Sequence, residues 1–475
     1  ARSRIAVVAN LYGDGMYAMF CNLLFNPQVR HLVALGQDLG LGASAEIRAF
    51  LSDGLEDADV LGRPVKRVSG TARLFPADQA FDERRLRATL SFHELGKLSS
   101  PDLGERLERL LAGLPRTRGP AGARLRVVTA ATDAEEHVRR PSQVGAHQVT
   151  RRTPLACWQE LLVRTVRFGA RVELRSGPRL ELRNATALIA EPAEDPPEAL
   201  ARLGFELERL RAYQRQMLAP LLPDGVSYTY GNRLRGHFAR AGADADTDAD
   251  TDADTLGAAI ELLRADSRTR GAYVSLWDTA RDLLDAEHDC AHARPCLTTL
   301  FFRAADGRLT LTATYRAHNL LAAWLQNVYG LMAIQRHVAV GAGMPVGALT
   351  VVSHSLGLDP RSPRAQLARA IAEDWRDDGE LDERTGRRSL RRDPNGYFLV
   401  DIDLARGCIV AEHRFDGLLV KRYEAERAVT IERQVAADMA VSLVSHALWL
   451  GRELARHERR LHEQAGAPAE GAGVG

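Results

Sequence analysis

The sequence predicts three modules that each combine helices and strands: an N-terminal α/β domain, a central domain and a small C-terminal α+β module. Strand and helix patterns alternate along residues 1–115, which is typical of an α/β domain with a parallel sheet. In the centre, Asp306-Gly307 is a strong hairpin turn signal between two strand patterns. Nearer the C-terminus, hairpin patterns precede a helical pattern, which indicates a separate α+β module.

Charge and cysteine content argue against a nucleic-acid-binding, metal-binding or membrane protein. The 475 residues include 63 Lys+Arg and 62 Asp+Glu, a net charge of +1, so no global field attracts nucleic acid or an anionic membrane. The five cysteines are scattered without a CxxC pair or zinc spacing, which fits a reducing, cytoplasmic compartment and predicts no metal site. Without a signal-peptide pattern or a run of ~18 apolar residues, we expect no membrane association.

The N-terminal domain, residues 1–115, should contain two strands, Ile5–Ala9 and His31–Leu35, because both are short apolar runs. Helical spacing of apolar residues predicts helices at Gly15–Phe25 and Ser44–Leu55. The segment after this domain, residues 116–150, is rich in Arg, Gly and Pro and predicts a linker.

The central domain, residues 151–364, should hold helices at Leu155–Gly169 and Gly204–Met217. An acidic repeat at residues 243–255 has Asp at every second position and predicts a solvated insertion. The C-terminal module covers residues 365–464 and is followed by a disordered tail, 465–475. Its expected elements are helix Arg364–Asp374, strands Tyr397–Leu404, Cys408–His413 and Leu418–Tyr423, and helix Ala428–His462.

The central hairpin brings Cys296, at the start of one strand, back toward Arg316 at the end of the next. A guanidinium near a thiol favours the thiolate, which is the nucleophilic form of cysteine. The alternative is a buried core cysteine beside a surface arginine.

A family resemblance favours the nucleophile. Pro295-Cys296, the Asp306-Gly307 turn, Arg316 and Asn327 resemble the catalytic region of thymidylate synthases, particularly archaeal-type relatives. The blocks Tyr228–Arg235 and Ser267–Trp277 resemble two further parts of that family, in the same order. The resemblance implies an α+β central domain with a large sheet, and a homodimer formed through that sheet.

The N-terminal residues resemble the corrinoid-carrying subunit of tetrahydromethanopterin S-methyltransferase through Asn10-Leu-Tyr, Asn22–Val33 and Gly36. His31 stands at the start of a strand, where a structural histidine and a cobalt ligand are the alternatives. We expect the fold without the corrinoid.

The resemblance to thymidylate synthases also implies roles for individual residues. Cys296 adds to C6 of a pyrimidine, Tyr230 helps to remove the C5 proton, and Arg316 contacts both the nucleotide phosphate and the cysteine. Asn327 reads the pyrimidine edge, because a carboxamide can donate to O4 and accept from N3–H of uracil.

Further contacts to substrate follow from the same resemblance. Arg175 matches a phosphate-gripping turn, with an exposed loop arginine as the alternative, and Arg268 or Arg270 reaches the phosphate of the other subunit. Ser355 lies in the block that contacts the sugar. The proton-organising glutamate of the family is assigned to Glu206 or Glu208, which are otherwise solvated face residues.

Several positions depart from the family. Leu297 replaces a His after the nucleophile, Tyr315 and Ala317 replace a Gln and a Ser, and Asn319 replaces an Asp that contacts the folate pterin. Gly357 and Asp359 stand where His and Tyr contact the sugar, so UMP and dUMP both remain candidate substrates.

The sequence therefore predicts folate-dependent transfer of a one-carbon unit from 5,10-methylenetetrahydrofolate to C5 of a uracil nucleotide. Trp324 and Asn319 are the expected cofactor contacts, and an apolar pocket with Trp324, Leu325 and Leu297 favours the methyl product. The alternatives are a hydroxymethylase, in which water traps the exocyclic methylene, and an inactive relative that binds a nucleotide or a corrinoid.

Overall fold

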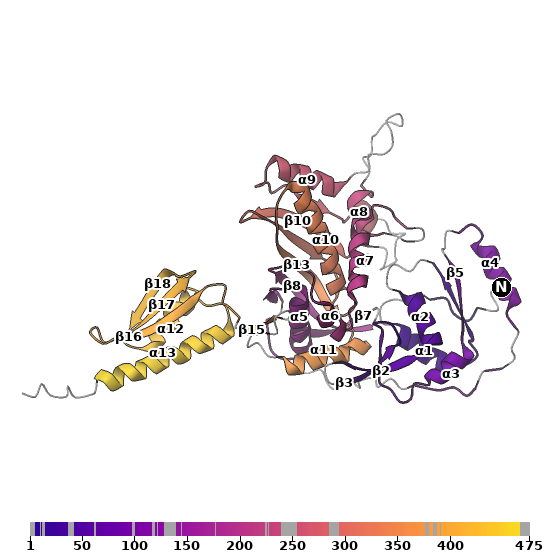
Figure 1. The fold of residues 1–475 in the computed structure, drawn as a ribbon, viewed down its shortest axis with the longest axis horizontal. Helices are drawn as coiled ribbons and strands as arrows, with labels where there is room; N and C mark the ends of the chain where they lie inside the picture. The colour runs from indigo at the N-terminus through magenta and orange to yellow at the C-terminus, as the bar shows by residue number, and fades with distance from the viewer. Residues whose placement is uncertain are drawn as a thin grey trace, which may run out of the picture. The chain divides into compact units, whose positions relative to one another are not determined.

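The computed structural model describes residues 5–9, 11, 15–36, 42–60, 63–96, 100–115, 119–120, 122–127, 139–143, 145–175, 177–223, 226, 228–238, 254–284, 294–375, 380–382, 387–389 and 391–465. They form two compact units, one that runs to Asp374 and one that begins at Trp375. Both units mix helices with sheets, as predicted (Figure 1). Most of the acidic insertion, residues 243–253, and the tail from residue 466 lie outside the described residues.

The N-terminal part contains the predicted helix α1 (Gly15–Phe25), strand β1 (His31–Leu35) and helix α2 (Ala43–Ser52). Strand β1 pairs in parallel with β5 (Ser91–Gly96), which confirms the expected parallel pairing. Aromatic side chains fill the core, where Phe20 stacks on Phe50 with ring centroids 4.2 Å apart. A second, antiparallel sheet of β2 (Leu55–Val60), β3 (Arg63–Val68) and β4 (Leu74–Pro76) was not predicted, and neither were helices α3 (Glu83–Thr89) and α4 (Leu103–Gly113).

The prediction of a strand at Ile5–Ala9 is wrong. These residues form no strand and are exposed, with Val7 at 79% and Val8 at 87% of full exposure. An apolar run becomes a strand only where it can pair and pack on a half-buried surface. Strand β1, the expected neighbour, pairs with β5 instead.

The central part is built on one sheet with the order β6-β8-β13-β11-β10-β9, with β7 added beside β8 and β12 beside β13. The predicted hairpin is confirmed, because β10 and β11 pair antiparallel around Asp306 (φ 51°) and Gly307 (φ 72°), a type I′ geometry. The strands are β6 (Gln148–Arg151), β7 (Ala170–Leu174), β8 (Gly177–Ile189), β9 (Tyr273–Ser275), β10 (Leu297–Ala305), β11 (Arg308–Tyr315), β12 (His318–Asn319) and β13 (Val346–Leu358).

Helices cover one face of this sheet. Helix α5 (Pro154–Phe168), which confirms the predicted helix, packs on β6 and β8, and α10 (Trp324–Ala342) packs on β11 and β13 (Figure 1). Helix α7 (Leu207–Leu218), also predicted, lies along α10 as a second layer. The remaining helices of this part are α6 (Pro197–Arg202), α8 (Tyr230–Arg235), α9 (Thr255–Ala265), a π-helical turn (Ala280–Leu284) and α11 (Pro363–Asp374), which packs on α5.

The two faces of the sheet differ in composition. Leu311 and Ala313 of β11 are fully buried beneath α10. The alternate residues point to the opposite face, where Thr312 pairs with Thr350 and Thr314 with Val352, and all four are only partly buried. This second face, within the described residues, has no helix packed on it in the way α5 and α10 cover the first.

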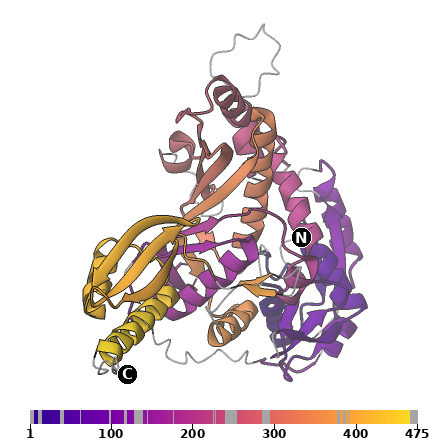
Figure 2. The same cartoon turned by 60° about the vertical axis from the view of Figure 1, so that its left-hand side comes forward.

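The second unit contains the predicted strands as a meander of β16 (Tyr397–Asp403), β17 (Cys408–Phe415) and β18 (Leu418–Ala425), preceded by the short pair β14 (Glu380–Asp382) and β15 (Arg387–Ser389). Helices α12 (Ala428–Ala437) and α13 (Val444–Ala465) pack on one face of the meander (Figure 2). The prediction of a single helix over Ala428–His462 was therefore wrong, because two helices cover this range. Met439 adopts φ 51°, which breaks the helix, and the Asp393 carboxylate accepts hydrogen bonds from the Ser442 and Leu443 amides that precede α13.

None of the helices in the described part of the chain is long and apolar enough to cross a membrane.

Candidate active site

The hairpin fixes Cys296 and Arg316 beside each other, as predicted from the sequence. Cys296 directly precedes β10 and is partly exposed, and the Arg316 amide donates to the Cys296 carbonyl at 2.9 Å. The Arg316 guanidinium donates through Nε to the Pro295 carbonyl (2.9 Å) and through Nη2 to the Arg294 carbonyl (3.0 Å). It also lies over the Trp277 ring, 5.7 Å from the centroid. The arginine thus holds the backbone that carries the cysteine.

The thiol itself is not activated in the free protein. Burial raises the pKa of Cys296 above its ordinary value, and the nearby Arg316 guanidinium lowers it by less. The expected effect of the arginine is present, but desolvation outweighs it. Cys296 is therefore mainly a thiol near neutral pH, and Arg316 keeps its pKa from rising further.

Tyr230 is brought to the same place by helix α8. The Thr229 hydroxyl caps this helix by accepting from the Asn232 amide at 3.0 Å, so Tyr230 is its first residue. Glycine follows at 231 because a Cβ there would lie 2.2 Å from the Ala219 carbonyl oxygen. The Tyr230 hydroxyl accepts from the Leu297 amide at 3.3 Å, and burial raises its pKa well above its ordinary value.

Asn327, on the first turn of α10, has both ends of its carboxamide bound. The Tyr213 hydroxyl donates to Asn327 Oδ1 at 2.7 Å, and Asn327 Nδ2 lies 3.0 Å from His318 Nε2. His318 Nδ1 lies 3.0 Å from Ser353 Oγ on β13. Burial lowers the pKa of His318 to about 3, so the imidazole is neutral near pH 7.

Tyr315 lies between Tyr230, which contacts the segment of Cys296, and His318, which contacts Asn327. Its ring stacks on His318, with centroids 4.0 Å apart, and lies edge-on to Tyr230 at 6.4 Å. Burial raises the pKa of Tyr315 well above its ordinary value, and the nearby ionisable groups Tyr213 and Cys296 act in the same direction. Its hydroxyl is fully buried, and no atom of the described residues pairs with it.

A close approach of α7 and α10 makes the Tyr213–Asn327 bond possible. At Gly330 on α10, a Cβ would lie 2.5 Å from Met217 Cγ and 3.0 Å from Tyr213 Cε1. The contact with Met217 is too short for a side chain unless Met217 shifts, and the contact with Tyr213 is tight. The absence of a side chain at Gly330 therefore sets the spacing at which Tyr213 reaches Asn327.

The sequence did not single out Tyr213, His318 or Ser353. No local pattern marks Tyr213, because an isolated tyrosine on an amphipathic helix usually packs in a core. His318 and Ser353 lie within blocks that resemble the family, but their contacts depend on how β12 and β13 pair.

The remaining predicted phosphate-binding arginines have exposed side chains. Arg175 is exposed in the turn between β7 and β8. Arg270 is exposed, and the Arg268 side chain is 92% exposed with its Nε 3.6 Å from Asp266. Ser355 donates to Glu181 on β8 at 2.5 Å, so its hydroxyl proton is bound within the protein.

The expected folate contacts and the glutamate are engaged by the protein itself. Asn319 Oδ1 accepts from the Leu321 and Ala322 amides, both at 3.1 Å, and Trp324 is 1% exposed. Glu206 and Glu208 carry largely exposed side chains that pair with Arg209 and Arg211, which corresponds to the solvated alternative.

Two polar groups of the N-terminal part are engaged by other residues of the protein. His31 Nδ1 lies 3.1 Å from His93 Nε2 on the neighbouring strand, so this nitrogen is engaged by a second histidine. Glu46 is 1% exposed and pairs with Arg73 at 2.8 Å and with Arg209 at 2.7 Å. Arg209 lies one turn before Tyr213 on α7, so this ion pair ties the N-terminal part to the helix that supports Asn327.

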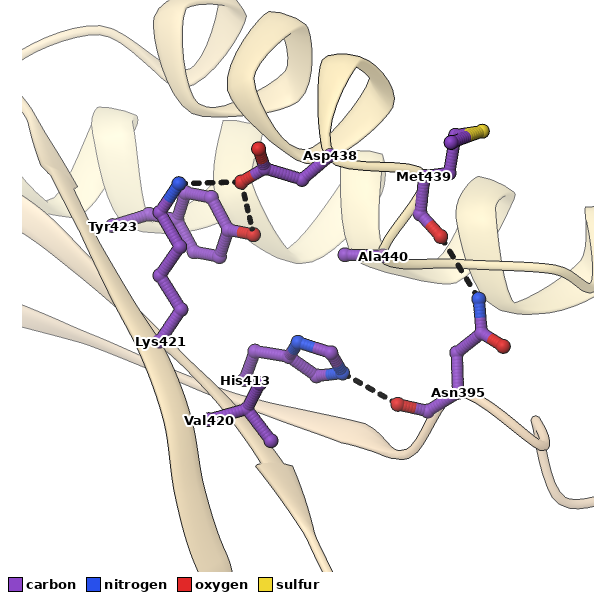
Figure 3. Close-up of a pocket in the computed structure, with 8 residues that line it drawn as sticks. All are labelled: Asn395, His413, Val420, Lys421, Tyr423, Asp438, Met439 and Ala440. Atoms are coloured by element: carbon purple, nitrogen blue, oxygen red, sulfur yellow. Dashed lines mark hydrogen bonds and ion pairs between the residues drawn. The ribbon is translucent and has the colours of Figure 1, made fainter.

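A separate hollow of about 470 Å³ lies in the second unit, between β18 and the turn after α12 (Figure 3). Asp438 binds both Lys421 Nζ (2.5 Å) and the Tyr423 hydroxyl (2.8 Å), and His413 Nε2 lies 2.5 Å from the Asn395 carbonyl. The hydrogen bond and charge of Lys421 lower the pKa of Asp438. These charged groups neutralise one another across the hollow.

The chain is similar to archaeal proteins named "Putative thymidylate synthase". It is 36% identical over 148 residues to that of Methanothermobacter thermautotrophicus, which covers 31% of this chain and 58% of the relative. It is 31% identical over 201 residues to that of Methanopyrus kandleri, which covers 42% of this chain and 87% of the relative. The chain belongs to the thymidylate synthase family. It spans less than two thirds of the length of the Methanothermobacter relative.

Residues 392–466 match the family PterinBD-DUF4346, a region that corresponds to most of the second unit. This thymidylate synthase family member therefore carries, beyond its central sheet, a module that the sequence alone predicted only as a small α+β fold.

Proposed function

We propose that the protein transfers a one-carbon unit from 5,10-methylenetetrahydrofolate to C5 of UMP or dUMP through a covalent Cys296 adduct, giving the 5-methyl nucleotide. The observation that carries this proposal is a single cluster of side chains from separate segments. Cys296, Tyr230 and Asn327 meet there through Tyr315, Tyr213 and His318. The relatives' names and the pterin-related family match support a nucleotide and a folate as substrates.

The chemistry begins with the thiol. Loss of the Cys296 proton gives a thiolate that adds to C6, and the ring electrons move to C5 and O4. C5 then attacks the one-carbon unit of the folate in its iminium form, and the electrons of the C–N double bond move to the folate nitrogen. Because the Arg316 guanidinium lowers the pKa of Cys296, it stabilises the attacking thiolate and the thiolate that leaves at the end.

Tyr230 acts as a neutral hydroxyl. Its raised pKa excludes a resting phenolate, and its oxygen already accepts from the Leu297 amide. The hydroxyl proton is therefore free to donate, so Tyr230 passes the C5 proton through a hydrogen bond to an acceptor.

The apolar surroundings favour the methyl product. Leu297, Trp324 and Leu325 are apolar and each at most 1% exposed, so these side chains are shielded from water. After the folate leaves, hydride transfer to the exocyclic methylene then competes well against attack by water. Hydroxymethyl transfer is the second candidate, because Asn319, which stands where the family has Asp, uses its carbonyl to hold a turn.

The test measures tritium release from C5-labelled UMP, dUMP, CMP and dCMP in the presence of 5,10-methylenetetrahydrofolate. Release should require a uracil nucleotide and should be abolished in Cys296→Ser, because a hydroxyl lacks the acidity of a thiol. Cys157→Ser and Cys408→Ser are matched controls, since both residues are buried free cysteines. Turnover by Cys296→Ser would refute the covalent mechanism, and a product one oxygen heavier without dihydrofolate would identify a hydroxymethylase.

A further inference from the structure

A chain of hydrogen bonds runs from Tyr213 through Asn327 and His318 to Ser353. The three links measure 2.7, 3.0 and 3.0 Å. His318, Asn327 and Ser353 are 4%, 6% and 1% exposed, so water does not replace these partners freely. The protein uses one lone pair and one N–H of the Asn327 carboxamide, which leaves one of each for a ligand.

A carboxamide can distinguish uracil from cytosine only if its oxygen and its nitrogen occupy fixed positions. Uracil offers an acceptor at O4 and a donor at N3, whereas cytosine offers a donor at N4 and an acceptor at N3. A carboxamide turned by 180° exchanges its oxygen and nitrogen and would therefore match cytosine. Discrimination thus depends on the groups that hold Asn327 in one orientation.

In the observed orientation each donor and acceptor has a definite role. The Tyr213 hydroxyl donates to Oδ1 of Asn327, and Nδ2 of Asn327 donates to His318 Nε2. A neutral imidazole has one N–H, so His318 then carries its proton on Nδ1 and donates to Ser353 Oγ. Turning the carboxamide by 180° would exchange donor and acceptor in all three hydrogen bonds. The hydroxyls of Tyr213 and Ser353 allow this, because a hydroxyl can either donate or accept.

We propose that Tyr213, His318 and Ser353 are positioning residues that set the orientation of the Asn327 carboxamide, and that the hydroxyls at the two ends bias it in opposite directions. The inference rests on the proposed function, because it concerns how that site chooses between uracil and cytosine.

The bias follows from the cost of an unpaired donor. A buried N–H without a partner is less tolerable than a carbonyl or ring nitrogen with an unused lone pair. Without the Tyr213 hydroxyl, the turned orientation leaves an Asn327 N–H unpaired, so the uracil-reading one is favoured. Without the Ser353 hydroxyl, the observed orientation leaves the His318 Nδ1–H unpaired, so the cytosine-reading one is favoured.

The experiment measures the affinities of UMP, dUMP, CMP and dCMP for the full chain by calorimetry. The ratio of uracil to cytosine affinity should rise in Tyr213→Phe and fall in Ser353→Ala, each on the order of tenfold. Ser353→Thr keeps a hydroxyl and should restore the wild-type ratio. A purely structural role would weaken both nucleotides alike, so ratios that stay constant or shift in the same direction overturn the inference.

Nitrogen NMR on the unaltered protein supplies a measurement that does not depend on a variant folding. With a uracil nucleotide bound, His318 should be the Nδ1–H tautomer, and an Nε2–H tautomer overturns the inference. If the wild-type protein binds none of the four nucleotides, the proposed function fails. If it binds uracil nucleotides but the ratios or the tautomer disagree, only this inference fails.

Discussion

The Tyr315 ring stacks on His318 at a centroid distance of 4.0 Å, while its fully buried hydroxyl has no hydrogen-bond partner among the described residues. An unpaired buried hydroxyl costs about 1–3 kcal/mol. Tyr315→Phe keeps the stacked ring and removes that cost, so the free protein should unfold at a higher temperature. If the hydroxyl donates to an oxygen of the nucleotide, the same change should weaken nucleotide binding about three- to tenfold.

Tyr329→Phe is the matched control for this prediction. Tyr329 is equally buried, but its hydroxyl accepts from the Asp195 amide at 2.8 Å and donates to the Asp195 carboxylate at 3.1 Å. This variant should lose stability and keep its nucleotide affinity. Thermal unfolding and calorimetry measure the two effects, and a destabilised Tyr315→Phe with normal affinity would contradict the assignment.

Removal of the Arg316 charge should make Cys296 less reactive. The guanidinium lowers the pKa of the thiol against the larger effect of burial, so Arg316→Met should raise that pKa further and reduce the thiolate fraction at pH 8. Alkylation of Cys296 by iodoacetamide, followed by peptide mass spectrometry, should be several-fold slower. Cys157 is 0% exposed and should stay unlabelled in both proteins. If Cys296 were alkylated at the same rate in Arg316→Met and in the wild-type protein, Arg316 would not act on the thiol.

His318 should make the fold sensitive to acid. Its folded-state pKa of about 3 lies below the value of about 6.5 in an unfolded chain. Between these values only the unfolded state takes up the proton, so stability falls as pH falls. From pH 7 to pH 5 this should lower the free energy of unfolding by about 2 kcal/mol.

Urea unfolding of His318→Gln at the two pH values checks this. The variant should show a smaller loss of stability on acidification than the wild-type protein. His354→Gln, an exposed histidine on the same strand as Ser353, should retain the full loss. The assignment fails if the His318 variant keeps the wild-type dependence on pH.

The partly buried face of the central sheet should form the expected homodimer. Val352 lies on this face beside Thr314 and Thr186, so Val352→Asp should place a charge in the interface and give monomers. Light scattering at micromolar concentration measures the change. Val340→Asp, at a 77% exposed position on α10, should leave the dimer intact, and a monomeric wild-type protein would disprove the interface.

Local patterns were sufficient where neighbouring residues determine the structure. Helix α1 and strand β1 begin and end at the predicted residues, and the hairpin turn has the geometry that Asp306-Gly307 requires. Pairing across that turn was also enough to bring Cys296 and Arg316 together. In contrast, β2 carries three acidic residues among six, Glu56, Asp57 and Asp59, which gave no strand signal.

Contacts between distant segments could not be predicted. Tyr213 is 114 positions from Asn327, and Asp393 is 50 positions from the Leu443 amide that it binds. Each depends on how helices or strands pack rather than on periodicity. Glu206 and Glu208 lie on the same stretch of chain as Tyr213, but their largely exposed side chains pair with Arg209 and Arg211, whereas Tyr213 bonds to Asn327.

Gly330 suggests how the base preference of such a site can evolve. The residue touches no substrate in the proposed reaction, yet its missing side chain lets Tyr213 reach Asn327. One nucleotide substitution converts a glycine codon to an alanine codon, and the added methyl group would press on the side chains of Met217 and Tyr213. Selection can therefore alter which nucleotide is accepted through a mutation behind the recognition residue, with every residue that faces the ligand unchanged.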